Sequence, residues 1–353
     1  MNFDPTDDRR MLADSMSRYL TDHYGWEHRL KIAYEAPFHD PQKWAEMSEL
    51  GVLFALADES VGGFGGAGFD IHTVFSELGR ALCPEPVLPA LMAARLLAAA
   101  GEDLALLLSG ETRYAVATGE LSAPYDLGEI ETEASGDRLS GRKSVVYGAH
   151  GADTFLVAAR NGDTIGLYCV AADAAHLTTY GLIDGGGAAE LFLEDTPARC
   201  ILPDVAAAFA DAQDAGALAL CAEAVGAMDT CKDMLLDYLK TRKQFGKTIG
   251  SFQVLQHRMV DLTIEIEQAR SITILAASRM GTPEQSRTAS MAKNLIGRVA
   301  KQIAEETIQM HGGIAMTWEH PASHFAKRLI MIDHQLGDTD YHLQRVMAVN
   351  QAA

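Results

Sequence analysis

Two polar segments in the C-terminal half of the chain carry side chains suited to binding a phosphorylated cofactor. They are 242–253 (RKQFGKTIGSFQ) and 308–313 (IQMHGG). A guanidinium can bind a pyrophosphate through two nitrogens, and glycines let a backbone approach a ligand closely. Together the segments predict a site for a dinucleotide. The candidate binding residues are Arg242, Gln244, Phe245, Gln253, Gln309, His311, Gly312 and Gly313.

Two of these residues also have plain structural explanations. Arg242 follows an expected helix end, where a cation stabilises the helix dipole. His311 can be a residue of the last helical turn before the two glycines. The residues alone leave both alternatives open, although the complete 242–253 segment favours phosphate contact for Arg242.

Helical periodicity dominates the part of the chain that holds both segments. Helices are predicted over 215–241, 252–280 and 286–310, with a last helix from about Tyr341. Four such helices fit a four-helix bundle. The first segment turns between two of these helices and enters the next one at about Ser251, and the second segment ends the third helix.

The remainder of the chain divides into helices followed by strands. Asp40 and Pro41 form a cap and a first helical residue, and apolar residues recur at helical spacing over 71–82. The pair Asn161-Gly162 between two apolar runs predicts a β-hairpin, in a small barrel or sandwich. We expect an α+β protein with a helical domain over 1–110, a β-domain over 111–204 and the bundle over 205–353.

The composition excludes several classes of function. The net charge of -19 repels phosphate backbones, so nucleic acid is an unsuitable partner. We expect no membrane span, because Arg95 interrupts the most apolar run, 88–100, and the N-terminus shows no signal-peptide pattern. Five scattered cysteines favour reduced thiols and a cytoplasmic location, and neither they nor the histidines have metal-ligand spacing.

One glycine-rich stretch, 63–68 (GFGGAG), matches the G-x-G-x-x-G pattern of dinucleotide-binding folds. No strand is predicted before it, no βαβ unit surrounds it, and Asp70 follows where it would repel phosphate. We therefore interpret it as a tight connection between helices.

The two C-terminal segments resemble the acyl-CoA dehydrogenase family of flavoenzymes. In that family an R-x-x-F-G-x-x-x-x-x-x-Q segment and a later Q-x-x-G-G segment reach across a subunit interface and hold the FAD of the neighbouring subunit. Residues 44–80 also look like the family's N-terminal helical domain. The resemblance implies FAD as cofactor, an acyl-CoA thioester as the substrate of an α,β-dehydrogenation, and an electron-transfer protein as a further partner.

The catalytic base of that family is missing at its usual positions. The family carries a Glu in the turn before the last helix, and matching on Thr339 puts Gly337 there, whereas counting from 319–321 puts Leu336 there. The second family location, on the first helix of the bundle, holds Gly216. Asp338 is the best substitute as a base, and its alternative role is that of a turn or cap residue.

The match of the 334–339 turn to the family pattern also makes Thr339 a candidate cofactor-binding residue. The acids closest to Gly216 in the sequence are Asp214 and Glu223. Asp214 is two residues from Gly216, so on a helix it faces a different direction.

The resemblance also shows which flavin contacts have changed. The family's T-E-P-G-A-G-S-D-like loop and W-I-T-N-like strand correspond here to 117–124 (ATGELSAP) and 143–148 (KSVVYG). Val145 and Tyr147 replace the aromatic residue and the threonine that face the flavin ring. The contacts that a chain makes to its own FAD are therefore eroded, whereas those to a neighbour's FAD are kept.

This asymmetry favours a divergent subunit of an α2β2 heterotetramer, of the kind that acts on steroid-CoA esters in some bacteria. A second acyl-CoA dehydrogenase-like chain would then be the partner and would carry the base. The alternatives are a complete homotetramer with Asp338 as the base, and a scaffold subunit without flavin.

Overall fold

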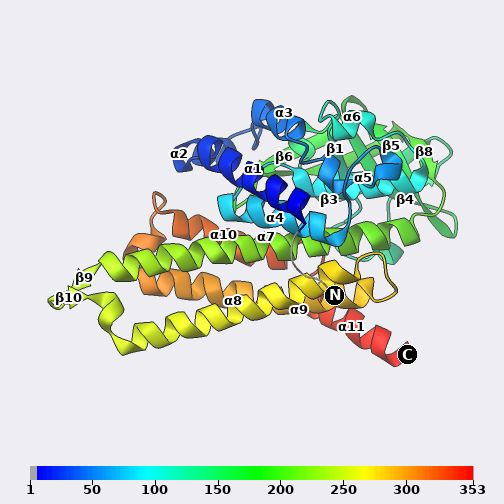
Figure 1. The fold of residues 1–353 in the computed structure, drawn as a ribbon. Coiled ribbons are helices and arrows are strands. Elements are labelled where there is room, and N and C mark those ends of the chain that lie inside the picture. Colours follow the sequence, from blue (N-terminus) through cyan, green and yellow to red (C-terminus); the bar gives the residue numbers. More distant parts are fainter. Residues whose placement is uncertain (1–5, 353) are drawn as a thin grey trace. The chain divides into compact units, whose positions relative to one another are not determined.

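The computed structural model describes residues 6–352 and divides into two compact units, each built from segments that are distant in the chain (Figure 1). Unit 1 comprises Met1–Trp26, Ile71–Cys83 and Ala217–Ala353. Unit 2 comprises Glu27–Asp70 and Pro84–Gly216. Within residues 6–352, no helix is long and apolar enough to cross a membrane, and no His, Cys, Asp and Glu side chains form a metal-binding group.

Short helices precede the sheet of unit 2. Asp40 caps α3 by accepting hydrogen bonds from the backbone N–H groups of Gln42 and Lys43, and Pro41 occupies the first turn, as the sequence predicts. Gly51 follows the helix with a φ of 85°, a value that glycine adopts without strain. The helices are α2 (Trp26–Tyr34), α3 (Pro41–Glu49), α5 (Val87–Ala100) and α6 (Ala105–Leu108).

The glycine-rich stretch after α3 is a tight connection, as we expected. The N–H groups of Gly65 and Gly66 donate to the carbonyl oxygens of Ala57 and Ala55. A Cβ atom at Gly63 would lie 2.1 Å from the Ala57 carbonyl oxygen, so the glycines are needed for close packing of backbone on backbone. Helix α4 (Gly68–Ala81) follows directly.

The centre of unit 2 is one mixed eight-stranded sheet. Seven strands follow the order β6-β7-β3-β2-β4-β5-β8, and β1 pairs with β4 in parallel. The predicted hairpin is present as the antiparallel pair β4 and β5, which Asn161 and Thr164 close across the turn. The strands are β1 (Tyr114–Ala117), β2 (Glu133–Ser135), β3 (Arg138–Tyr147), β4 (Thr154–Asn161), β5 (Thr164–Ala171), β6 (His176–Gly181), β7 (Gly187–Pro197) and β8 (Arg199–Leu202).

Unit 1 is helical, and the three long helices predicted for it are confirmed. The sequence analysis missed α10, although Pro321 at its first position and the buried Phe325, Leu329 and Ile332 give it an N-terminal signal and a helical stripe. The helices of unit 1 are α1 (Asp7–His23), α4 from Ile71 on, α7 (Ala206–Thr241) from Ala217 on, α8 (Gln253–Arg279), α9 (Gln285–His311), α10 (Pro321–Asp333) and α11 (Thr339–Ala352).

Helices α4 and α7 touch through two glycines. A Cβ atom at Gly79 would lie 2.0 Å from the carbonyl oxygen of Glu223, and one at Gly226 would lie 2.0 Å from that of Ser76. Real side chains do not approach backbone atoms so closely, so this crossing depends on the absence of a side chain at both positions.

Candidate functional site

The first cofactor segment forms a small hairpin at the end of α7. Strands β9 (Lys243–Gln244) and β10 (Lys247–Thr248) pair antiparallel, and the two residues between them, Phe245 and Gly246, have φ values of 53° and 79°. Positive φ at both central residues is the geometry of a type I′ turn, which matches the twist of a two-residue hairpin. Residues 249–251 then form one 3-10 turn, so α8 begins at Gln253 rather than at Ser251.

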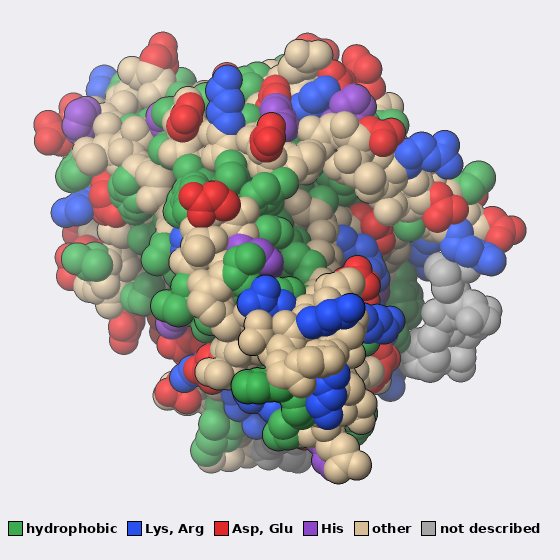
Figure 2. Space-filling model, turned by 90° about the vertical axis from the view of Figure 1, so that its left-hand side faces the viewer, with side chains coloured by type: hydrophobic (Ala, Val, Ile, Leu, Met, Phe, Trp, Pro, Cys, Tyr) green, Lys and Arg blue, Asp and Glu red, His purple; other side chains and the backbone are tan. Residues whose placement is uncertain are grey.

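This hairpin presents its side chains outward. The side chain of Phe245 is 88% exposed. Arg242, one residue beyond α7, is exposed, and its guanidinium has no hydrogen-bond or ion-pair partner among residues 6–352, although its backbone N–H donates to the carbonyl oxygen of Tyr238. Figure 2 looks onto this end of unit 1 and shows Lys and Arg side chains gathered there. The exposed cations here are Lys240, in the last turn of α7, and Arg242, Lys243 and Lys247 of the segment.

The second cofactor segment ends α9. Gly312 has a φ of 73° and its N–H donates to the carbonyl oxygen of Ile308, which makes it the glycine cap of the helix. A Cβ atom at Gly313 would meet no atom within 4 Å, so the backbone there is open to close approach. Gln309 is exposed on the preceding turn.

Side-chain contacts bring the two segments to one end of the bundle. The ring of His311 lies 4.9 Å from that of Tyr238, one helical turn before Arg242. Arg258 of α8 donates to Glu306 of α9 at 2.7 Å, so the end of α8 that begins with Gln253 lies beside the C-terminal end of α9. The predicted cofactor residues outside the 334–339 turn therefore cluster within unit 1.

His311 has a different place from its neighbours in this cluster. It is 4% exposed, and its Nδ1 lies 2.8 Å from the carbonyl oxygen of Thr307. Burial lowers the pKa of its ring, which favours the neutral form. Its ring therefore supports the contact between α7 and α9 beneath the exposed residues.

The turn that carries the base in the family has no room for it here. Gly337 has a φ of 103°, and a Cβ atom on it would lie 2.3 Å from the ring of Tyr341. Leu336, also with a positive φ of 56°, is apolar. Asp338 accepts a hydrogen bond from the Tyr341 N–H at 2.8 Å, which caps α11. Thr339 donates its hydroxyl hydrogen to Asp333 at 2.8 Å.

Two buried side chains hold the backbone of this turn. The ammonium of Lys293 donates to the carbonyl oxygens of Asp333 at 3.0 Å and Gly337 at 2.8 Å. The Nε2 atom of His342 lies 3.0 Å from the carbonyl oxygen of Leu336. Burial lowers the pKa of Lys293 to about 8 and that of His342 to about 3. The sequence analysis missed both, although Lys293 stands among the apolar positions of its helix.

The second family location carries no carboxylate of its own, and the nearby Asp214 is buried. Gly216 is buried inside α7. Glu223, two turns further, forms a two-point ion pair with Arg328 of α10, with N–O distances of 2.6 and 2.8 Å. Both oxygens of Glu223 are thus committed to a structural contact.

The 143–148 strand, which the resemblance places against the chain's own flavin ring, makes hydrogen bonds within the protein instead. The Ser144 hydroxyl and the Val145 N–H both donate to the carboxylate of Glu190 on β7, at 2.8 and 3.4 Å. Tyr180 donates to the same group at 3.0 Å. Burial alone would raise the pKa of Glu190, but these hydrogen bonds outweigh burial and lower it. An anionic carboxylate thus binds two donors of this strand, the Ser144 hydroxyl and the Val145 N–H, and nothing in the sequence pattern indicated it.

Models of one family match both ends of the chain. The acyl-CoA dehydrogenase N-terminal domain matches residues 6–104, and the acyl-CoA dehydrogenase C-terminal domain matches residues 208–349. Helices, a central sheet and a C-terminal helical bundle in this order define the class, which is that of FAD-dependent oxidoreductases acting on acyl-CoA thioesters.

Similar proteins place the chain within that class. It is 30% identical over 330 residues to the acyl-CoA dehydrogenase IpdE2 of Mycobacterium tuberculosis, covering 92% of this chain and 91% of the relative. The protein of the same name from Mycolicibacterium smegmatis is 29% identical over 348 residues, covering 97% and 99%. The chain belongs to the acyl-CoA dehydrogenase family.

Solved structures agree with this assignment. A variant of the Tcur3481-Tcur3483 steroid ACAD superimposes with a TM-score of 0.89 at 28% identity, covering 98% of this chain and 99% of the other. The ChsE4-ChsE5 complex from Mycobacterium tuberculosis has the same fold, with a TM-score of 0.91, 22% identity and full coverage of both chains.

Proposed function

We propose that this chain is one subunit of a heteromeric, FAD-dependent acyl-CoA dehydrogenase, and that it supplies contacts to the FAD of a second, related subunit. The complex would remove hydrogen from the α- and β-carbons of an acyl-CoA thioester. The partner subunit would carry the catalytic carboxylate. Three observations support this proposal, and the first carries it.

The exposed end of unit 1 has the chemistry of a cofactor-binding surface. The guanidinium of Arg242 is exposed without a partner among the described residues, Phe245 is almost fully exposed, and Gly313 leaves its backbone accessible. A helix-capping role does not require an outward aromatic ring or an open glycine. A pyrophosphate fits the guanidinium and the surrounding lysines, and an adenine ring fits an aromatic face.

The second observation is the absence of a base at either family position in this chain. A general base must reach the proton that it removes, in a dry environment that raises its pKa. Gly337 cannot carry a side chain without displacing Tyr341, and Glu223 is paired with Arg328. Asp338, the substitute that the sequence suggests, is used as a helix cap.

The third observation concerns the chain's own flavin half-site. Two donors of the 143–148 strand, the Ser144 hydroxyl and the Val145 N–H, are bound to Glu190, an anionic group that does not suit a flavin gaining negative charge on reduction. A chain that has lost these contacts and kept those to a neighbour's cofactor is complete only beside a different chain. Two similar structures, a Tcur3481-Tcur3483 steroid ACAD and a ChsE4-ChsE5 complex, are also named for pairs of chains.

The roles of the residues follow from their positions. Bound FAD would accept a hydride from the β-carbon of the substrate. Arg242 would bind its pyrophosphate, Phe245 and the amides of Gln244 and Gln253 would border it, and the 309–313 backbone would approach it closely. Thr339, bonded to Asp333, would stabilise the turn rather than reach the cofactor.

Several further expectations belong to this proposal. A steroid-like or lipid acyl group as substrate and assembly with a second chain fit the names of the similar structures, and we also propose an α2β2 stoichiometry and a cytoplasmic location. An electron-transfer flavoprotein as acceptor fits the caffeyl-CoA reductase-Etf complex subunit CarC of Acetobacterium woodii, 27% identical over 61% of this chain. We also propose domain boundaries near residues 110 and 204.

The test is anaerobic bleaching of flavin absorbance in the purified chain, reconstituted with excess FAD and mixed with acyl-CoA substrates. We expect little or no bleaching, because the chain lacks a base. Rapid bleaching that Asp338→Asn abolishes would instead favour the homomeric enzyme with Asp338 as the base. A chain that never binds flavin, even when its partner is present, would be a scaffold subunit.

A further inference from the structure

Arg95 is the one charged residue of α5, whose remaining residues are apolar (VLPALMAARLLAAA). Its side chain is 20% exposed and borders a cavity inside unit 2. We propose that this cavity is a binding site for a neutral alicyclic molecule that carries a ketone or hydroxyl oxygen, and that Arg95 binds this oxygen. No role in the flavin site proposed above accounts for this residue.

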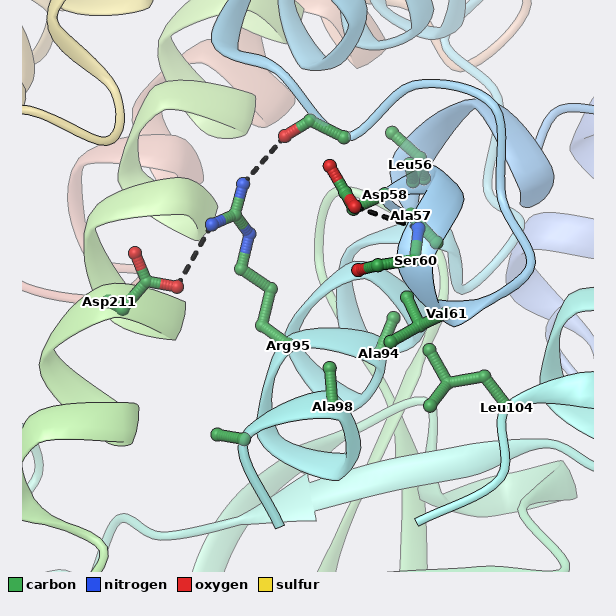
Figure 3. A pocket seen from close by; sticks show the side chains of 12 residues that line it. Leu56, Ala57, Asp58, Ser60, Val61, Ala94, Arg95, Ala98, Leu104 and Asp211 are labelled. Carbon is green, nitrogen blue, oxygen red and sulfur yellow. Dashed lines mark hydrogen bonds and ion pairs between the residues drawn. The ribbon is translucent and has the colours of Figure 1, made fainter. Parts of the chain in front are cut away.

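The cavity has the size and lining of a small-molecule site. Its volume is about 410 Å³, within the usual range for such pockets. Figure 3 shows Arg95 rising from α5 between Asp211 on one side and Asp58 and Ser60 on the other. Most of the remaining lining is aliphatic. It consists of Leu56, Ala57, Val61, Ala94, Ala98, Ala99 and Leu104, with Gly66.

Two contacts fix the guanidinium of Arg95 in place. Its Nη1 donates to the carboxylate of Asp211 at 2.9 Å, and its Nη2 donates to the carbonyl oxygen of Gly66 at 2.8 Å. Its other N–H groups have no hydrogen-bond partner among residues 6–352. A guanidinium that is already held loses little freedom when it binds a further acceptor.

The charges around the cavity select the class of ligand. Two carboxylates, those of Asp58 and Asp211, border the cavity, against the single cation of Arg95. Hydrogen bonds from Ser60 lower the pKa of Asp58, which favours its charged form. An anionic ligand would therefore be repelled. Alanine methyl groups offer flat apolar contact, which suits a saturated ring better than a charged chain. An uncharged oxygen that accepts from Arg95 completes the match.

A structural role for Arg95 makes a different prediction. If Arg95 only ties α5 to Asp211 and Gly66, removing it lowers the stability of the protein. In that case the cavity has no ligand, and filling it does not change the binding of any ketone. Separate variants must therefore change the hydrogen-bond donor of Arg95 and the volume of the cavity.

The experiment is a ligand-observed NMR titration of the full-length chain with 2-decalone, 2-decalol and decalin-2-carboxylate. We expect saturable binding of the ketone and the alcohol with a Kd of about 1 mM or below, as is typical of ligands of this size. The carboxylate should bind at least about tenfold more weakly. If cyclohexanecarbonyl-CoA displaces the ketone, the cavity binds the acyl group of a substrate. If it does not, the cavity binds a free metabolite. In both cases the ketone must first bind saturably.

Three variants separate the interpretations. Ala98→Leu keeps both Arg95 contacts but fills the cavity, and should abolish ketone binding while the protein stays folded. Arg95→Met should weaken ketone binding about tenfold, the value of one hydrogen bond to a charged donor. Arg138→Met, on the exposed part of β3, is the matched control and should bind like the wild type.

The proposal is overturned if the wild type shows no saturable binding of the ketone. It is also overturned if Ala98→Leu binds the ketone normally, or if the carboxylate binds as tightly as the ketone. Because Ala98→Leu leaves the Arg95 contacts in place, instability of Arg95→Met cannot hide these results.

Discussion

The ammonium of Lys293 donates to the carbonyl oxygen of Gly337 at 2.8 Å, inside the turn where related enzymes carry their base. The lysine is fully buried, and its second contact is to the carbonyl oxygen of Asp333 at the C-terminal end of α10. A cation at a helix C-terminus is favourable, and here it also fixes the turn. These contacts fix the turn, in which the Asp338 carboxylate caps α11.

This burial predicts a pH dependence of stability. The pKa of Lys293 is lowered from 10.5 to about 8 in the folded state, so between these values the unfolded chain binds more protons. Stability from this group therefore rises with pH above about 8. Relative to Lys293→Met, the wild type should gain roughly 1 kcal/mol between pH 7 and pH 9. Urea midpoints at both pH values measure this.

The control for that measurement is Lys301→Met, an exposed lysine of the same helix. It should show no comparable change between the two pH values. An unchanged difference between wild type and Lys293→Met would mean that Lys293 stays charged in the folded chain.

Breaking the ion pair between Glu223 and Arg328 should destabilise the protein strongly. Their side chains are only 9% and 14% exposed, so Glu223→Gln leaves a buried guanidinium without its counter-charge. We expect a loss of about 3 kcal/mol in the free energy of unfolding. Asp7→Asn, in a pair whose side chains are 61% and 90% exposed, should cost under about 0.5 kcal/mol. Similar effects of both substitutions would refute a buried structural role for Glu223.

The glycine crossing of α4 and α7 should tolerate no side chain. Gly79→Ala places a methyl group 2.0 Å from the Glu223 carbonyl oxygen, and neither helix can move without repacking unit 1. We expect a loss of about 3 kcal/mol or more, measured by chemical unfolding. Gly25→Ala is the control, since a Cβ atom there meets nothing within 4 Å. A Gly79→Ala protein as stable as this control would contradict the close contact.

Replacing Arg242 by lysine separates its two explanations. Lysine keeps a cation beside the helix end but cannot form two parallel hydrogen bonds to a pyrophosphate. We expect FAD affinity of the assembled complex to fall about tenfold or more, with little change in the thermal stability of the flavin-free protein. Arg18→Lys on the exposed side of α1 is the control. Loss of apo stability with unchanged FAD affinity would make Arg242 structural.

Local patterns predicted most of the fold. The cap at Asp40, the Asn161-Gly162 turn and the apolar spacing of the long helices each act within a few residues, and each is present in the structure. Helix α10 was missed because it is short and its apolar stripe consists of only a few buried residues. The clustering of 242–253 with 309–313 could be expected only from the family resemblance.

The contacts that occupy the 334–339 turn and the 143–148 strand could not be predicted from local sequence patterns. Glu190 binds Ser144 across a strand pair, and Lys293 reaches Gly337 across a turn, so each depends on a tertiary contact. Asp338 looked like a possible base because the sequence shows its charge but not its hydrogen bond to the Tyr341 N–H. The cavity beside Arg95 likewise exists only once α5, α7 and the glycine-rich connection are in place.

The flavin content of the native assembly tests the central claim most directly. The chain would be tagged, purified from its own host under native conditions, and analysed for subunit composition by native mass spectrometry and for FAD by absorbance. The account predicts a complex with a second acyl-CoA dehydrogenase-like chain, containing one FAD for each pair of unlike subunits. A homotetramer of this chain with one FAD for every subunit would contradict it.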